Sequence, residues 1–249
     1  MAELKDIGVF NLLCVMWMLI CWFGYAQFAR KRSRHIGSLS SVLHVHRINW
    51  MRRMMLREVR VGDAALLANV ERNVNFFASS CVLIIAGLLT ALTATAEIQS
   101  MLNAVSFISK VSVVQIELKI LTLVAIFIYA YFTFTWSMRQ FGFASVLIGA
   151  APAPDDVTVT ANEKRSMAIY SAKVIDLASN SYNNGLRAFY FSIAVLSWFI
   201  SPIFFIASSA LVTTILYQRE FRSSALSALK KAENVGEKLF KDDKDLYRP

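Results

Sequence analysis

Long apolar runs alternate with polar and charged stretches along this chain. Four apolar runs are long enough to cross a bilayer, and they cover residues 7–28, 74–96, 118–138 and 189–216. Because a helix rises about 1.5 Å per residue, about 20 apolar residues cross the ~30 Å hydrocarbon core of a bilayer. The pattern therefore predicts an all-α integral membrane helical bundle with about four transmembrane helices.

The segments between these runs show helical periodicity with polar faces. Residues 29–72 are basic, and a helix over 47–61 would lie in the membrane interface with arginines on one side and Met and Val on the other. The spacing also predicts a short amphipathic helix within 97–117, on the opposite membrane face. A second cytoplasmic helix is expected over 161–180, ended by the polar residues 180–185.

Glycine and proline predict where these helices end or bend. Gly62 and Asp63 would break the basic helix, and Pro152 and Pro154 would end the helix that contains the third run. Pro202 lies near the middle of the fourth run and would kink it. We expect one membrane domain over 1–217 and a charged C-terminal tail over 218–249.

Composition supports a membrane protein, and charge predicts its orientation. Hydrophobic residues make up 56% of the chain and charged residues 17%, against about 25% charged in soluble domains. Residues 29–72 hold ten Lys and Arg and three acids, most of the net charge of +9. The positive-inside rule places this segment in the cytoplasm and the N-terminus outside. Four spans then leave the tail outside, whereas a re-entrant 189–216 segment would leave it inside.

Polar side chains at the cytoplasmic ends of the spans form the main candidate site. A cluster there, such as Glu71 with Arg139 or Arg187, could bind an anionic substrate or lipid headgroup. The alternative is an interhelical hydrogen-bond network with arginines reaching the interface. The candidate set is Glu71, Arg72, Asn73, Asn75, Arg139, Asn183, Asn184 and Arg187.

The arginines of the basic segment are candidates for contact with anionic lipids. They are Arg47, Arg52, Arg53, Arg57 and Arg60. Each basic group near an anionic surface contributes about 1 kcal/mol. Such clusters also serve simply to set membrane topology. Nucleic acid is not an expected partner, because no recognised binding motif accompanies the charge.

Neither a cofactor, a metal site nor catalytic chemistry is expected. His35, His44 and His46 lack the spacing of a metal signature, and they lie outside the spans, which disfavours a haem held inside the bundle. The sequence contains no HExxH, GxSxG, P-loop or GxGxxG motif. The first run lacks a basic region before it and a cleavage site after it, so we expect a retained anchor.

Four segments resemble an uncharacterised membrane family of bacteria and plants, domain of unknown function 599. They are RINWMRRMMLREVRVGDA (47–64), ERNVNFFASS (71–80), FTFTWSMRQFGFAS (132–145) and NNGLRAFYFSIAVLSWFISP (183–202). The resemblance implies a bacterial inner-membrane protein and no specific activity. We expect a non-enzymatic structural or regulatory protein that acts through partner subunits, lipid headgroups or self-association. The alternative is an oligomeric channel or transporter.

Overall fold

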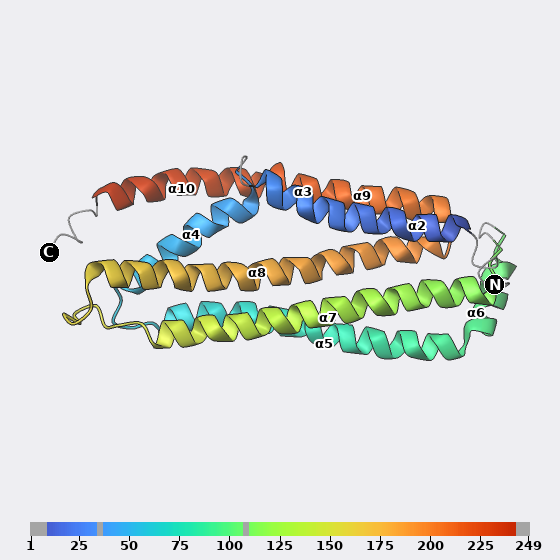
Figure 1. Ribbon diagram of the computed structural model, residues 1–249, viewed down its shortest axis with the longest axis horizontal. Helices are drawn as coiled ribbons and strands as arrows, with labels where there is room; N and C mark the ends of the chain where they lie inside the picture. Colours follow the sequence, from blue (N-terminus) through green and yellow to red (C-terminus); the bar gives the residue numbers. More distant parts are fainter. Residues whose placement is uncertain (1–8, 34–36, 107–109, 243–249) are drawn as a thin grey trace. The chain divides into compact units, whose positions relative to one another are not determined.

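The computed structural model describes residues 9–33, 37–106 and 110–242. Within these ranges all regular structure is helical and none is strand, so the predicted all-α class is confirmed (Figure 1). The elements are α2 (Val9–Leu19), η1 (Ile20–Gly24), α3 (Tyr25–Arg32), α4 (Leu39–Met54), α5 (Val61–Thr93), α6 (Thr95–Ala104), α7 (Val113–Gly149), α8 (Ala161–Trp198), α9 (Pro202–Phe221) and α10 (Ser224–Asp242).

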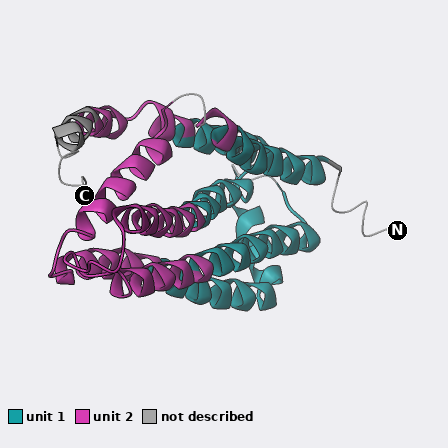
Figure 2. Ribbon diagram, turned by 60° about the vertical axis from the view of Figure 1, so that its left-hand side comes forward, with its two compact units in different colours: residues 1–29, 76–134, 183–216 teal, residues 30–75, 135–182, 217–249 magenta. Residues whose placement is uncertain are grey.

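The chain divides into two compact units, each assembled from three stretches of sequence (Figure 2). Unit 1 comprises Met1–Ala29, Phe76–Phe134 and Asn183–Leu216, and unit 2 comprises Arg30–Asn75, Thr135–Tyr182 and Tyr217–Pro249. The long helices α5, α7 and α8 contribute residues to both units.

Three helical segments in the described ranges are long and apolar enough to cross a membrane. They are Phe10–Arg32, Val61–Thr93 and Val113–Gly149. Each overlaps one of the first three predicted runs, and Val113–Gly149 contains the third run completely. This finding is consistent with a membrane protein.

The fourth predicted span is wrong in its continuity, because residues 189–216 are divided between two helices. α8 ends at Trp198 and α9 begins at Pro202. Proline is favoured at the first position of a helix, where its missing N–H is not needed. Figure 1 shows α9 returning beside α2, and the indole N–H of Trp17 donates to the carbonyl of Ile206 at 3.3 Å. Pro202 therefore starts a reversed helix and does not kink a continuous one.

The predicted helix end at 180–185 is also wrong, because these residues lie inside α8. Gly185 is buried, and a Cβ added there would lie 2.5 Å from the ring of Phe134. The hydroxyl of Ser181 donates to the carbonyl of Leu177 one turn earlier. Close packing against α7 explains the glycine, which the sequence pattern alone suggested was a breaker.

Aromatic side chains fill much of the interior of unit 1. Phe134 stacks on Phe77 with ring centroids 5.5 Å apart, and Trp22 stacks on Phe191 at 5.4 Å. Trp22 lies in the π-helical turn η1. A second, aliphatic cluster joins Val111, Ile116, Ile120 and Val124 of the region around the start of α7. These contacts hold the apolar helices of this unit together.

Small and polar side chains join α7 to α8 in unit 2. The buried hydroxyl of Ser137 donates to the carbonyl of Ala178 at 2.7 Å, and Ser181 hydrogen-bonds to the side chain of Gln140 at 2.9 Å. α8 begins with a reciprocal cap, since Thr160 and Glu163 each accept from the other's backbone N–H. The hydrogen bond from the Thr160 side chain lowers the pKa of Glu163 below its ordinary value.

The basic segment folds differently from its prediction. Its helix, α4, ends at Met54, and α5 begins at Val61, so Gly62 and Asp63 lie in the first turn of α5. An acidic side chain in the first turn is favourable because the N-terminus of a helix carries partial positive charge. The predicted break therefore lies earlier, at residues 55–60.

The C-terminal helix α10 packs against α4 (Figure 1). α10 follows α9 after only two residues. Because α4 and α10 are in contact, the tail and the basic segment must lie on the same side of any membrane. The four-span prediction had instead placed the tail and the basic segment on opposite sides of the membrane.

The close approach at Gly185 generates a stability prediction. Gly185→Ala should destabilise the protein by about 1–3 kcal/mol, because the new methyl group would overlap the buried Phe134 ring. The measurement is thermal unfolding of the purified protein in a mild detergent.

Gly87→Ala is the matched control, because a Cβ at Gly87 of α5 meets no atom within 4 Å. Alanine is the better helix former, so this variant should be neutral or slightly more stable. Equal melting temperatures for the two variants would contradict the packing described here.

Candidate functional site

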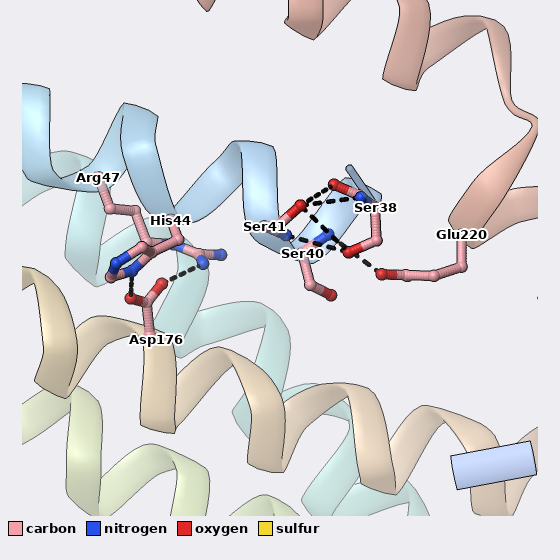
Figure 3. Close-up of polar contacts among 7 residues, drawn as sticks. All are labelled: Ser38, Ser40, Ser41, His44, Arg47, Asp176 and Glu220. Atoms are coloured by element: carbon pink, nitrogen blue, oxygen red, sulfur yellow. Dashed lines mark hydrogen bonds and ion pairs between the residues drawn. The ribbon is translucent and has the colours of Figure 1, made fainter. Parts of the chain in front are cut away.

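A polar network centred on α4 is the main concentration of charged contacts in unit 2. The helix starts with a cap in which the Ser38 N–H donates to Ser41 Oγ at 2.8 Å and the Ser41 N–H donates to Ser38 Oγ at 3.2 Å. The N–H of Ser40 donates to Glu220 Oε1 at 3.1 Å (Figure 3). The start of α4 is thereby joined to the end of α9.

Asp176 of α8 receives two side chains from α4, one from an arginine and one from a histidine. Arg47 Nη1 donates to Asp176 Oδ1 at 2.6 Å, and His44 Nδ1 contacts the other carboxylate oxygen (Figure 3). The Asp176 side chain is only 14% exposed. These residues form an ion pair that links α4 to α8, and both carboxylate oxygens are used.

A second histidine of α4 faces α10. His46 Nε2 donates to the carbonyl of Leu229 at 3.1 Å. Nearby, a Cβ added to Gly37 would lie 3.0 Å from Cε of Lys230. The two histidines thus contact two different helices, and they do not converge on one site.

Asp63 is a buried carboxylate near the start of α5, with its side chain 1% exposed. Its Oδ1 accepts from the indole N–H of Trp50 at 2.6 Å and from Arg57 Nη1 at 2.5 Å. Within the described ranges its Oδ2 is buried and has no hydrogen-bond partner. Asp63 therefore joins the end of α4, the 55–60 connection and α5.

Arg60 lies at the end of the 55–60 connection, next to α5. Its guanidinium donates to the carbonyls of Ala151 at 2.6 Å and Pro152 at 2.5 Å, just beyond the end of α7. The last carbonyls of a helix lack intrahelical donors, and a cation is favourable beside them. Arg60 thus satisfies carbonyl groups that follow α7.

The arginines predicted to contact lipid are largely engaged inside the protein. Arg47 and Arg57 form ion pairs, and Arg60 binds backbone carbonyls. Arg52 and Arg53 also interact with the protein. Lipid contact through these residues stays a prediction, and the structure adds a second role for three of them.

The predicted polar cluster is divided between the units. Unit 2 contains Glu71, Arg72, Asn73, Asn75 and Arg139, and unit 1 contains Asn183, Asn184 and Arg187. In the described part of the chain, Glu71 forms no ion pair or hydrogen bond, and Arg139 lies over the ring of Phe143 at 5.8 Å. Arg72, Asn73, Asn75, Asn183 and Arg139 are exposed, and Glu71 is half-buried. Within unit 2, Glu71 and Arg139 form no ion pair in the part of the chain that the structure describes.

Arg187 is the member of this set with the most contacts in unit 1. It is half-buried, and its Nη1 donates to Asn184 Oδ1 at 3.1 Å. Its guanidinium lies 5.6 Å from the centre of the Tyr25 ring. The structure therefore joins Arg187 to Asn184 and to an aromatic side chain.

Lys119, near the start of the third predicted run, is a buried basic residue that the sequence pattern did not single out. Lys119 is 2% exposed, and its ammonium lies 5.6 Å from the Trp198 ring and 5.4 Å from the Phe199 ring. Trp198 in turn donates its indole N–H to Asn11 Oδ1 at 3.1 Å. A single lysine inside an apolar run was the available signal, but its burial depends on helices distant in sequence.

Metal ligands do not gather within the described ranges, where no three His, Cys, Asp or Glu side chains are placed to hold an ion. His35 lies outside the described residues. Cys14 and Cys81 are buried free thiols, and Cys21 is half-buried.

Comparison with known families gives a match over most of the chain. The model of the family described as "Protein of unknown function, DUF599" matches residues 13–225. Comparison with curated proteins gives no match, and comparison with solved structures gives none either.

The environment of Asp63 generates the second stability prediction. Asp63→Asn should cost about 2 kcal/mol, because it removes the charge from a buried hydrogen-bond acceptor of Arg57 and Trp50. The matched control is Asp155→Asn, since Asp155 is exposed and should change stability by less than about 0.5 kcal/mol. The measurement is chemical unfolding in detergent, followed by tryptophan fluorescence. Similar losses for both variants would show that Asp63 has no special structural role.

Proposed function

This chain belongs to the DUF599 family of proteins of unknown function, and we propose that it is a non-enzymatic, multi-pass protein of the bacterial inner membrane. Its role is structural or regulatory, and it acts through unit 2. That unit would bind anionic lipid headgroups, partner subunits or a second copy of the chain.

The observation that carries this proposal is the division of charge between the units. Unit 2 contains 22 of the 26 Lys and Arg residues and 13 of the 17 Asp and Glu residues. It thus accounts for the whole net charge of +9, and unit 1 has a formal charge of zero. Charged side chains are costly in hydrocarbon. Unit 1 is therefore suited to the bilayer and unit 2 to the aqueous phase and the headgroups.

Helix length supports the same division. α5, α7 and α8 contain 33, 37 and 38 residues, whereas about 20 residues cross the hydrocarbon. Each helix is therefore long enough to cross the bilayer and to extend beyond it. A helical platform of this kind suits binding to partners.

The proposed topology has five crossings, with the N-terminus outside and the tail inside. The crossings are α2 with α3, α5, α7, the part of α8 in unit 1, and α9. The reversal at 199–201 supports a fifth crossing, and the packing of α10 on α4 supports a tail on the side of the basic segment. This arrangement obeys the positive-inside rule, because unit 2 holds most of the Lys and Arg residues.

A non-enzymatic role fits the use of polar groups in unit 2. Several polar side chains of this unit bind neighbouring helices or connections, namely Asp63, Asp176, His44 and Arg60. An enzyme needs titratable groups that converge on a reacting atom. These side chains instead hold helices in place.

Cysteine accessibility tests the topology. Ser106→Cys, Ala153→Cys and Ser227→Cys each place a thiol at an exposed position. In spheroplasts, a membrane-impermeant maleimide should label position 106 at once. Positions 153 and 227 should react only after the membrane is opened.

The parent protein, with its three native cysteines in apolar segments, gives the background labelling. Labelling of position 227 in sealed spheroplasts would overturn the five-crossing arrangement.

Native mass spectrometry after mild-detergent purification tests how the protein acts. We expect retained anionic lipid, a co-purifying subunit or a defined oligomer. A lipid-free monomer under conditions that preserve the fold would contradict the proposed function.

A further inference from the structure

Lys119 is an ionisable side chain buried in the unit suited to the bilayer. It lies in the part of α7 that belongs to unit 1 and is 2% exposed. Ionisable side chains inside membrane proteins usually mark a binding site or an ion path, because their burial is costly. Lysines near a helix end commonly extend to the interface instead. The burial of Lys119 shows that it does not follow that pattern.

Aromatic rings are the observed neighbours of its ammonium group. The Trp198 and Phe199 ring centres lie 5.6 and 5.4 Å from Nζ. An ammonium group has three N–H donors and no acceptor. In the described ranges, Lys119 donates no hydrogen bond and forms no ion pair. Its hydrogen-bonding capacity is unused.

Other basic side chains of unit 1 are better satisfied. Arg187 also lies on an aromatic ring, but it is half-buried and donates to Asn184. Lys110 is exposed, so water can solvate it. Lys119 alone among these three combines full burial with the absence of an acceptor.

The buried positive charge of Lys119 would be stabilised by a negatively charged partner. Burial of an ammonium group costs more than contact with two aromatic rings returns. A carboxylate of the chain would restore the balance, but none in the described ranges pairs with it. A bound anion would supply both the missing charge and the missing acceptor.

We propose that Lys119 forms a binding site for a small monovalent anion, such as a halide or a short carboxylate. Trp198 forms one wall of the site, and its hydrogen bond to Asn11 fixes the indole beside the ammonium. The site lies at the end of unit 1 where α8 gives way to α9. This inference goes beyond the proposed function, which depends on unit 2.

Iodide is a suitable probe, because it is a small anion that quenches indole fluorescence on contact. Trp198 is fully buried, so iodide should reach it only by entering the site. The full chain, purified in a neutral detergent, is titrated with sodium iodide against sodium gluconate at constant ionic strength. We expect a saturable quenching component in the wild-type protein, above the linear quenching of exposed tryptophans such as Trp136.

Three variants assign that component to the site. Lys119→Met should weaken iodide binding at least tenfold, and Trp198→Phe should remove the signal. Lys119→Arg keeps the charge and should retain saturable quenching. Lys110→Met is the matched control, because it removes an exposed lysine and should leave the component unchanged.

Acrylamide, a neutral quencher, shows whether each variant keeps its fold, since its quenching should be equal in all except Trp198→Phe. Purely linear iodide quenching in the wild-type protein would overturn the proposal. So would saturable quenching of equal affinity in wild type and Lys119→Met. Neither result depends on the membrane topology, so the proposed function is tested separately.

Discussion

The separation of charged from apolar residues governs the organisation of this protein. Unit 1 contains four Lys and Arg residues and four Asp and Glu residues, whereas unit 2 contains the remaining 35 charged side chains. α5, α7 and α8 pass through both compositions without interruption. The same helices can therefore be packed by aromatic contacts in one unit and by ion pairs in the other. Each of these helices continues from one unit into the other, but a different kind of interaction holds it in each unit.

In unit 2, two carboxylates join one helix to another. Asp176 joins α4 to α8, and Asp63 joins the end of α4 to the start of α5. Each receives an arginine that the sequence suggested was directed to lipid. A buried or half-buried ion pair is sensitive to loss of one partner, because the remaining charge is left without compensation. These arginines thus belong to the architecture of the unit, whatever they also contribute at a membrane surface.

Lys119 is a charged residue of unit 1 that is also fully buried. Its neighbours are aromatic rings, and it lies near the break between α8 and α9. That break depends on Pro202, which cannot continue a helix without loss of a hydrogen bond. Trp198, the last residue of α8, stacks on Phe205 across the break at 4.9 Å and also contacts Asn11. The end of α8 thus joins a lysine, a tryptophan and an asparagine from three helices.

The sequence by itself determined the helical class, the three long apolar helices and the uneven distribution of charge. Hydrophobic periodicity and composition are local properties of a sequence. For that reason the end of α7 before Pro152 could be predicted correctly. Tertiary structure decided which residues break helices and which charges pair. Residue 185 is a glycine within a helix because Phe134 occupies the space that a side chain would need. Pro202 begins a reversed helix, and α9 packs beside α2. The pairing of Arg47 with Asp176 and the burial of Lys119 likewise require contacts across more than 70 residues of sequence, which local patterns do not contain.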